Sequence, residues 1–230
     1  MVTGNNRPPV VALVCSAGGL QAIERILSGL TPGFPAAVIV LRHQDPQAAN
    51  LLATILQRSS RLPVRLARDG DALIAGRVLV APAGYHTMVT CGYTIVLVRS
   101  GDRPPYRPSA DLLLTSVAIA ARNRAVVVVL SGYGIDGATG ATAIHHLGGT
   151  VIASDESTSA VFAMPYATIS RAEVIDHVLP VGEISALLAG ILIGRVRRSS
   201  RDRISPASAA DASDRHAHPA EQGRSATADD

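Results

Sequence analysis

Several residue types are missing or rare in this sequence, and each absence removes a class of chemistry. The chain has no lysine, no tryptophan and only two cysteines among its 230 residues. Without lysine it cannot form a Walker-type phosphate loop, a Schiff base or a Ser–Lys dyad. Cys15 and Cys91 are too few for a disulfide framework and lack the spacing of metal ligands. We therefore expect neither a metal site nor a cofactor.

Aromatic residues are also scarce, at 3% of the chain, whereas 47% of the residues are hydrophobic. The core must therefore consist mainly of Val, Ile, Leu and Ala, which suits a parallel sheet covered by helices. A chain of this length can bury such a core as one domain of moderate size.

No segment has the pattern of a signal peptide or of a membrane span. The first seven residues are mostly polar and are followed by Pro8 and Pro9. The longest apolar stretch, 184–194, is well short of the ~20 residues that a transmembrane helix needs. We expect a cytoplasmic protein without membrane insertion.

The positive charge of the chain is modest and gathers near its C-terminus. The formal net charge is +3, and all 21 basic Lys or Arg positions are arginine. Five arginines fall between residues 195 and 203. There they fit the basic edge of a solvated tail better than a groove for nucleic acid. We expect no nucleic-acid partner.

The sequence predicts one folded domain over residues 9–196. Residues 1–8 and 197–230 are predicted to be disordered. Beyond residue 199 the chain turns to Ser, Ala, Asp, Arg and His with hardly any large apolar side chain, so it cannot bury enough surface to become ordered.

Within the domain, short apolar runs alternate with helical patterns. Strands are predicted at 10–14, 36–41, 125–130, 150–153 and 174–179. Helices are predicted from Leu20 to Leu30 and at 50–56, 109–121, 137–147, 167–171 and 183–193. Shorter strands at 77–81, 86–90 and 93–98 form a β-rich insertion. This order predicts a doubly wound α/β fold, with a mostly parallel sheet, helices on both faces and a small β-hairpin insertion.

Three polar residues each follow a predicted strand. Ser16 follows the first strand, His43 the second, and Asp136 lies a few residues beyond the strand at 125–130. The carboxyl ends of parallel strands meet at one edge of the sheet, where ligands bind in such folds. A serine hydroxyl becomes nucleophilic when an imidazole takes its proton, and a carboxylate orients that imidazole. The three residues are therefore our candidate catalytic triad.

Backbone N–H groups near this edge are candidates for an oxyanion site. The turn after Ser16 places Ala17 and Gly18 at the start of a helix, where N–H groups favour negative charge. Gly132 and Tyr133, in the glycine-rich segment before Asp136, are further candidates for oxyanion or substrate binding.

Each candidate also has a simpler structural interpretation. Ser16 and Asp136 each precede a predicted helix and could serve as its N-cap. His43 could lie at a strand end without any function. Cys15 would be the nucleophile of a thiol enzyme, but it is one residue closer to the strand and is expected to pack inward.

Six segments, in order along the chain, resemble the catalytic domain of chemotaxis-type protein-glutamate methylesterases. These are VVALVCSAGGL at 10–20, VIVLRHQDP at 38–46, RVLVAP at 77–82, RPSAD at 107–111, SGYGIDG at 131–137 and VFAMP at 161–165. The resemblance covers essentially the whole predicted domain. Single segments are weak signals, but the ordered set is specific.

The resemblance implies that Ser16, His43 and Asp136 are the catalytic triad. The reaction would be hydrolysis of γ-methyl esters on glutamate side chains in the cytoplasmic helices of a chemoreceptor. Deamidation of receptor glutamines would follow the same route, because only the leaving group differs. The implied partner is a methylated receptor domain or a similar protein, and the oligomeric state stays open.

The sequence departs from the family pattern around the triad. Val14 and Ala17 replace a usual Gly and Thr, Tyr133 and Ile135 replace Met and Asn, and Tyr106 replaces His. Family members usually carry an N-terminal receiver domain, which this sequence does not show, so regulation by an attached receiver is not expected.

Two other functions compete with the esterase. A degenerate member of the family would bind a receptor or signalling partner without turnover, as the changed residues suggest. Nucleotide binding through Gly18 and Gly19 would require a G-x-G-x-x-G motif and an acidic residue at the end of the second strand, and both are missing.

Overall fold

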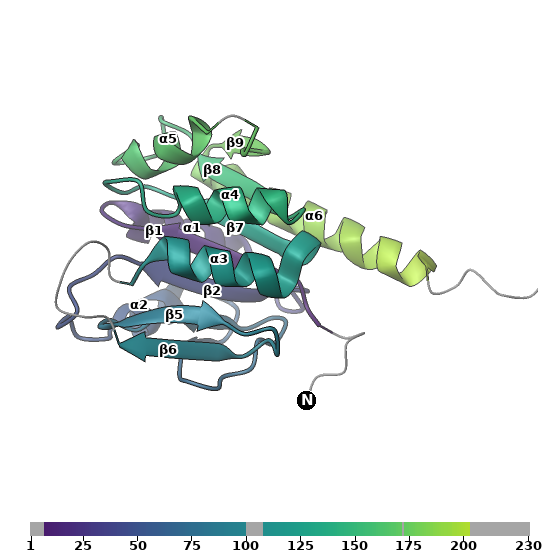
Figure 1. Ribbon diagram of the computed structural model, residues 1–230, viewed down its shortest axis with the longest axis horizontal. Helices are drawn as coiled ribbons and strands as arrows, with labels where there is room; N and C mark the ends of the chain where they lie inside the picture. Colours follow the sequence, from purple (N-terminus) through teal and green to yellow (C-terminus); the bar gives the residue numbers. More distant parts are fainter. Residues whose placement is uncertain (1–6, 100–107, 172, 203–230) are drawn as a thin grey trace, which may run out of the picture. The chain divides into compact units, whose positions relative to one another are not determined.

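A computed structural model describes residues 7–99, 108–171 and 173–202, and the chain up to Gly194 forms one compact unit (Figure 1). Its centre is a seven-stranded sheet in the order β3-β4-β2-β1-β7-β8-β9, in which every paired strand is parallel. The strands are β1 (Val10–Cys15), β2 (Ala37–Arg42), β3 (Val64–Leu66), β4 (Val78–Val80), β7 (Ala125–Val129), β8 (Thr150–Ser154) and β9 (His177–Leu179).

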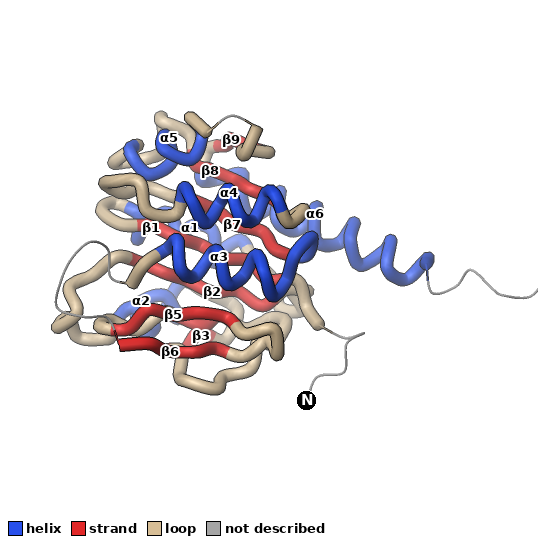
Figure 2. Tube along the Cα trace, in the orientation of Figure 1, coloured by secondary structure: helices blue, strands red, loops and turns tan. Residues whose placement is uncertain are grey.

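Helices cover both faces of the sheet (Figure 2). They are α1 (Gly19–Gly29), α2 (Leu52–Ser59), α3 (Ala110–Ala121), α4 (Ala138–His146), α5 (Ala163–Ile169) and α6 (Val181–Asp202). One core contains apolar side chains of α1, α2 and α6, and the other contains those of α3 and α4. The doubly wound α/β fold predicted from the sequence is confirmed.

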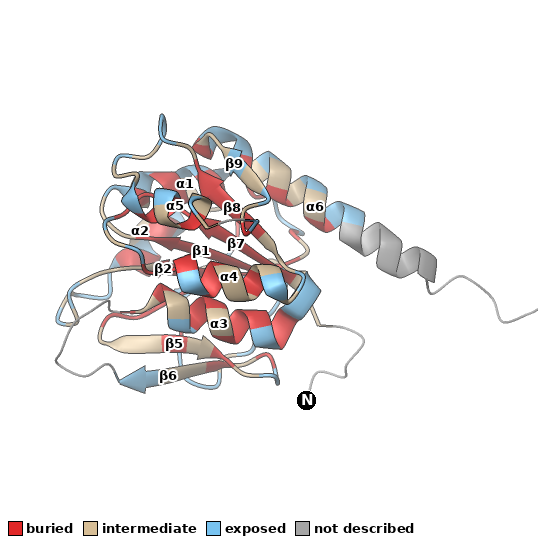
Figure 3. Cartoon of the chain, turned by 45° about the horizontal axis from the view of Figure 1, so that its top comes forward, coloured by how far each residue is buried: buried red, intermediate tan, exposed pale blue. Residues whose placement is uncertain are grey.

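The central strands are buried from both sides because they lie between these two helical layers (Figure 3). All residues of β1 and β7 are fully buried. Along β1, Val10, Ala12 and Val14 face the core beneath α3 and α4, whereas Val11, Leu13 and Cys15 face the core beneath α1. This alternation follows from the pleat of a strand, in which successive side chains point to opposite faces.

The predicted β insertion is an antiparallel hairpin of β5 (Tyr85–Val89) and β6 (Ile95–Arg99). It packs beside α3, where the Val89 N–H donates to the Ser116 hydroxyl at 3.0 Å. Residues 77–81, predicted as part of the insertion, instead supply β4 of the parallel sheet. Strand β3 is not among the predicted strands, because this edge strand has three residues and no fully buried side chain.

The last helix is longer than the sequence predicted. Helix α6 continues to Asp202, whereas its pattern predicted an end at 193. Arginine has a high helix propensity, which favours this extension. Residues 1–6 and 203–230, where disordered segments were predicted, lie outside the described residues. Within the described ranges, none of the helices combines the length and apolar character that a membrane span requires.

Candidate active site

The structure brings the ends of β1, β2 and β7 together in register. Cys15 and Arg42 are paired across β1 and β2, so Ser16 and His43 follow at adjacent positions. The His43 N–H donates to the Cys15 carbonyl at 3.0 Å, and the Ser16 N–H donates to the Ser131 carbonyl at 2.9 Å. Backbone hydrogen bonds therefore hold the Cys15–Ser16 segment between the segment that contains His43 and the segment that leads to Asp136.

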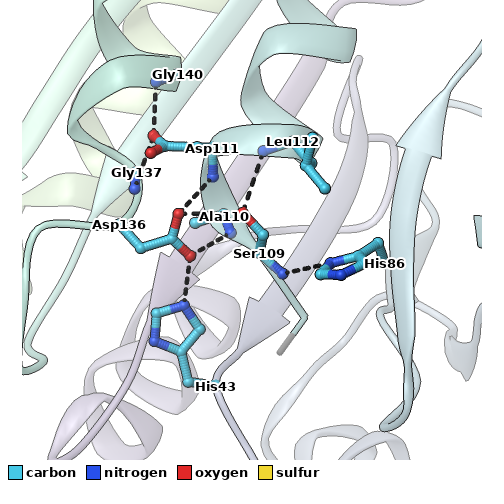
Figure 4. Close-up of polar contacts among 9 residues, drawn as sticks. All are labelled: His43, His86, Ser109, Ala110, Asp111, Leu112, Asp136, Gly137 and Gly140. Carbon is cyan, nitrogen blue, oxygen red and sulfur yellow. Dashed lines mark hydrogen bonds and ion pairs between the residues drawn. The ribbon is translucent and has the colours of Figure 1, made fainter. Parts of the chain in front are cut away.

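His43 and Asp136 form a hydrogen-bonded pair (Figure 4). The distance between His43 Nε2 and Asp136 Oδ2 is 2.8 Å, and their side chains are 10% and 2% exposed. In so little solvent, a carboxylate fixes both the orientation and the tautomer of the ring it contacts. Because Nε2 contacts Asp136, a proton that His43 exchanged with a substrate or a hydroxyl group would pass through Nδ1.

Asp136 is held by the start of α3 as well as by His43. Its Oδ2 accepts from the Ala110 N–H at 2.7 Å, and its Oδ1 accepts from the Asp111 N–H at 2.9 Å and from the Ser109 hydroxyl at 3.2 Å. Burial raises the pKa of Asp136, but the hydrogen bonds from His43, Asp111 and Ala110 outweigh it, so the pKa lies below its usual value. The carboxylate thus stays ionised and available to His43.

The simple capping roles considered for Ser16 and Asp136 are not the ones observed. Helix α1 begins after Gly18, and α4 begins after Gly137, and neither receives a capping hydrogen bond from its N-cap side chain. Asp136 instead caps α3, which follows a different part of the chain. His43 is likewise not an idle strand-end residue, because it is bonded to Asp136.

The N-terminus of α1 lies directly after Ser16, as the oxyanion prediction requires. Gly18 adopts the left-handed conformation with φ 73°, and the first turn of α1 contains no acidic residue. The positive end of the helix dipole is therefore not neutralised by a side chain of its own first turn. A developing negative charge beside Ala17 and Gly18 would be stabilised there.

Gly132 is also predicted to take part in oxyanion or substrate binding. In the structure its N–H donates to the Val161 carbonyl at 2.9 Å. Its contribution is space, because a Cβ at this position would lie 2.6 Å from Ser16 Cβ and 2.2 Å from Met164 Sδ. Tyr133, the next residue, is 67% exposed at the surface of the same loop.

This close approach predicts the effect of Gly132→Ala. The added methyl group must push Ser16 or Met164 aside, so we expect the free energy of unfolding to fall by about 1–3 kcal/mol and the esterase rate proposed below to fall with it. Gly190→Ala is the matched control, because nothing lies within 4 Å of a Cβ there; its position inside α6 should make alanine neutral or stabilising. Urea unfolding of both variants tests this, and equal stabilities would contradict the packing described.

Ser131 is a site residue that the sequence analysis did not single out. Its buried hydroxyl donates to the Ala17 carbonyl at 2.8 Å and accepts from the Val161 N–H at 2.9 Å. It therefore ties the turn after Ser16 to the segment that precedes α5. The signal in the sequence was a hydroxyl residue at the end of an apolar strand, which by itself does not reveal its partners.

Cys15 packs inward, as predicted. It is fully buried beneath α1, where a Cβ on Gly19 would lie 2.6 Å from its Sγ. Burial raises the pKa of Cys15 to about 12, although the charge of Arg42 opposes this shift. A thiol with such a pKa is almost entirely protonated at neutral pH and is a poor nucleophile.

The two thiols should therefore differ sharply in reactivity. We expect a thiol-specific reagent to modify the exposed Cys91 rapidly in the native protein and to modify Cys15 only after unfolding. The Cys91→Ser variant isolates the signal of Cys15. Native Cys15 that reacts as fast as Cys91 would overturn the assignment of a buried, inert thiol and would reopen the thiol-enzyme interpretation.

The described residues contain no group of three or more His, Cys, Asp or Glu side chains that could hold a metal ion. A parallel sheet with helices on both faces, and a histidine–aspartate pair at the ends of its central strands, define a doubly wound α/β protein with a hydrolase-type pair.

Comparisons with known proteins give this class a family. The CheB methylesterase family model matches residues 11–188. A protein-glutamate methylesterase/protein-glutamine glutaminase 2 from Anaeromyxobacter dehalogenans (strain 2CP-C) is 44% identical over 185 residues, which cover 79% of this chain and 53% of the relative. A protein-glutamate methylesterase/protein-glutamine glutaminase 4 from Burkholderia thailandensis is 39% identical over 196 residues, which cover 85% of this chain and 56% of the relative. The chain spans about half the length of the curated relatives it matches.

A solved structure is similar over nearly all of its length. The crystal structure of the Thermotoga maritima CheB methylesterase catalytic domain matches with a TM-score of 0.76 and 32% sequence identity, covering 80% of this chain and 98% of that one. This chain belongs to the CheB methylesterase family.

Proposed function

We propose that this chain hydrolyses methyl esters of glutamate side chains and that Ser16, His43 and Asp136 are its catalytic triad. The observation that carries the proposal is the 2.8 Å hydrogen bond between the partly buried His43 and the buried Asp136, at strand ends adjacent to Ser16. The relatives named above support the reaction class. A module that only binds a partner would not need a buried carboxylate to orient a histidine.

The reaction begins with attack of Ser16 Oγ on the ester carbonyl while His43 Nδ1 accepts the hydroxyl proton. Asp136 stabilises the imidazolium through Nε2. The tetrahedral intermediate collapses as the C–O bond to the methoxy group breaks, and His43 returns the proton so that methanol leaves. Water then gives a proton to His43 and attacks the acyl group, which releases glutamate and restores the Ser16 hydroxyl.

The oxyanion of each tetrahedral intermediate is stabilised by the backbone at the start of α1. The N–H groups of Ala17 and Gly18 are the proposed donors, assisted by Tyr133 from the loop after β7. Fixed donors of this kind typically contribute a factor of 10²–10³ to kcat each. Ser131 supports them by holding the Ala17 carbonyl, which fixes the turn.

The substrate we propose is the methylated cytoplasmic domain of a chemoreceptor or a similar protein, and the site of action is the cytoplasm. Glutamine side chains are proposed as second substrates, with ammonia leaving in place of methanol. Tyr133 and Ile135, which are 67% and 64% exposed, give the loop before Asp136 an apolar surface. Such a surface suits contact with a protein rather than with a small polar molecule.

Methanol release from a methylated receptor fragment tests the proposed function. We expect the wild-type chain to release methanol in proportion to the number of methyl esters present, and the His43→Ala variant to release it at the uncatalysed rate. Binding of the fragment by both proteins, with no release above that rate by either, would refute the esterase and favour the binding module.

A further inference from the structure

The first turn of α3 is capped by an aspartate that precedes α4, and the first turn of α4 is capped by an aspartate of α3 (Figure 4). Asp136, which leads into α4, accepts from the first two N–H groups of α3. Asp111, the second residue of α3, accepts from the first turn of α4: its Oδ1 lies 2.9 Å from the Gly137 nitrogen and 2.7 Å from the Gly140 nitrogen. The two carboxylates thus exchange backbone donors across the helix pair.

Two glycines of α4 make this exchange geometrically possible. At Gly140 a Cβ would lie 2.4 Å from Leu114 Cβ and 3.1 Å from the Asp111 carbonyl oxygen, so only glycine lets α4 approach α3 this closely. Gly137, the N-cap of α4, has φ 101° and has no side chain with which to cap the helix itself. Asp111 supplies the missing cap from α3.

Because Gly137 directly follows Asp136, the hydrogen bond between Asp111 and Gly137 also affects the position of Asp136. Glycine has unusual backbone freedom, and Gly137 directly follows the residue that holds His43. Without the Asp111 carboxylate, the Gly137 N–H loses its acceptor, and the peptide between Asp136 and Gly137 is free to rotate. The Asp136 carboxylate would then move away from His43 Nε2.

We propose that Asp111 is a positioning residue of the active site, which fixes Asp136 in its contact with His43 by capping α4 at Gly137 and Gly140. Asp111 touches neither the substrate nor His43. As a role in catalysis, this inference rests on the proposed function; as a statement about the His43–Asp136 contact, it does not.

The pKa of Asp111 lies above its usual value. Burial raises the pKa of Asp111, and the negative charge of Asp136 adds to this shift, while the Gly140 and Gly137 N–H groups and Arg171 lower it. The cap requires an oxygen acceptor rather than a charge, because one oxygen, Oδ1, accepts both bonds. Asparagine offers the same acceptor in the same shape, which provides a conservative variant.

The test compares Asp111→Ala, Asp111→Asn and Asp176→Ala. Asp176 is the matched control, because its carboxylate accepts the Val151 N–H at 2.7 Å at the opposite edge of the sheet. We expect Asp111→Ala to lower kcat for methanol release by about 100-fold, the cost of misplacing a reacting group by about 1 Å, with KM changed less than threefold. Asp111→Asn should recover kcat to within about fivefold of the wild type. Asp176→Ala should lose stability without such a loss of kcat.

A spectroscopic measurement separates this inference from the proposed function. The far-downfield proton resonance of the His43–Asp136 hydrogen bond should be lost or shifted in Asp111→Ala and kept in Asp111→Asn. An unchanged resonance in Asp111→Ala, or a kcat equal to that of Asp176→Ala, overturns the positioning role. A changed resonance in a chain whose wild type releases no methanol refutes the esterase and leaves the positioning role standing. If Asp111→Ala does not fold, Gly140→Ala displaces α4 from the same carboxylate, and the same outcomes apply to it.

Discussion

Replacing Ser16 by alanine should reduce ester hydrolysis by about four orders of magnitude or more in kcat while leaving the fold intact. The substitution removes one oxygen atom and keeps the backbone hydrogen bond from Ser16 to the Ser131 carbonyl. The remaining oxyanion donors stabilise the transition state but have no nucleophile to assist. Methanol release under single-turnover conditions, with thermal unfolding as a check of the fold, measures the effect.

The control for Ser16→Ala is Ser28→Ala. Ser28 is an exposed serine of α1 whose hydroxyl donates to the Arg25 carbonyl at 2.8 Å, and its loss should change kcat less than twofold. A Ser16→Ala variant that keeps more than a tenth of the wild-type rate would show that another group attacks the ester.

Replacing Asp136 by alanine should lower kcat by a similar factor and should also destabilise the protein. In triads of this kind, loss of the carboxylate's charge lowers kcat by about 10⁴ even when the geometry is kept. Here the alanine variant also leaves the Ala110 and Asp111 N–H groups without their buried acceptor. Each unsatisfied donor costs about 1–3 kcal/mol, so for the two donors together we expect the free energy of unfolding to fall by about 2–6 kcal/mol.

The stability loss should depend on pH in a defined direction. Because the pKa of Asp136 is lower in the folded protein than in the unfolded chain, the carboxylate contributes stability above its unfolded value of about 3.9, and this contribution is lost as the pH falls through the folded value. Urea unfolding at pH 7 and at pH 3 should therefore show a larger difference between the wild type and Asp136→Ala at pH 7. A difference that grows at low pH would contradict the ionised, hydrogen-bonded state of Asp136.

Much of the fold could be predicted because the central strands are encoded locally. The runs at 10–14 and 125–130 are continuously apolar, which is typical of strands buried on both faces. The observed strands β1 and β7 occupy these positions almost residue for residue. Features that depend on tertiary contacts were less accessible: β3 is short and half exposed, and the assignment of 77–81 to the hairpin failed because pairing with β2 is not visible in the local pattern.

The candidate site divides in the same way. The positions of Ser16, His43 and Asp136 after their strands could be predicted from sequence order and from the rule that parallel strands end at one edge. The roles of Ser131 and Asp111 could not be predicted, because their hydrogen bonds join distant segments. The Ser131 hydroxyl bonds a residue 114 positions away, and the Asp111 carboxylate bonds residues 26 and 29 positions away. The hydrogen bond from the Gly132 N–H to the Val161 carbonyl could not be predicted for the same reason, because it also joins segments far apart in the sequence.

The structure shows the surroundings of several residues at which this sequence departs from the family pattern. Tyr133 and Ile135, at two of these positions, are exposed. Ala17 keeps its backbone N–H and its carbonyl, which the Ser131 hydroxyl holds. The hydrogen bond between His43 and Asp136 is present beside these changes.

Covalent labelling with a fluorophosphonate probe tests the central claim most directly, because such probes react only with a serine activated by its surroundings. After incubation of the native chain at neutral pH, peptide mass spectrometry should find one adduct, on Ser16, and no adduct in the His43→Ala variant, where the proton acceptor is missing. An adduct on any other residue, or equal labelling of the wild type and His43→Ala, would contradict the triad of Ser16, His43 and Asp136.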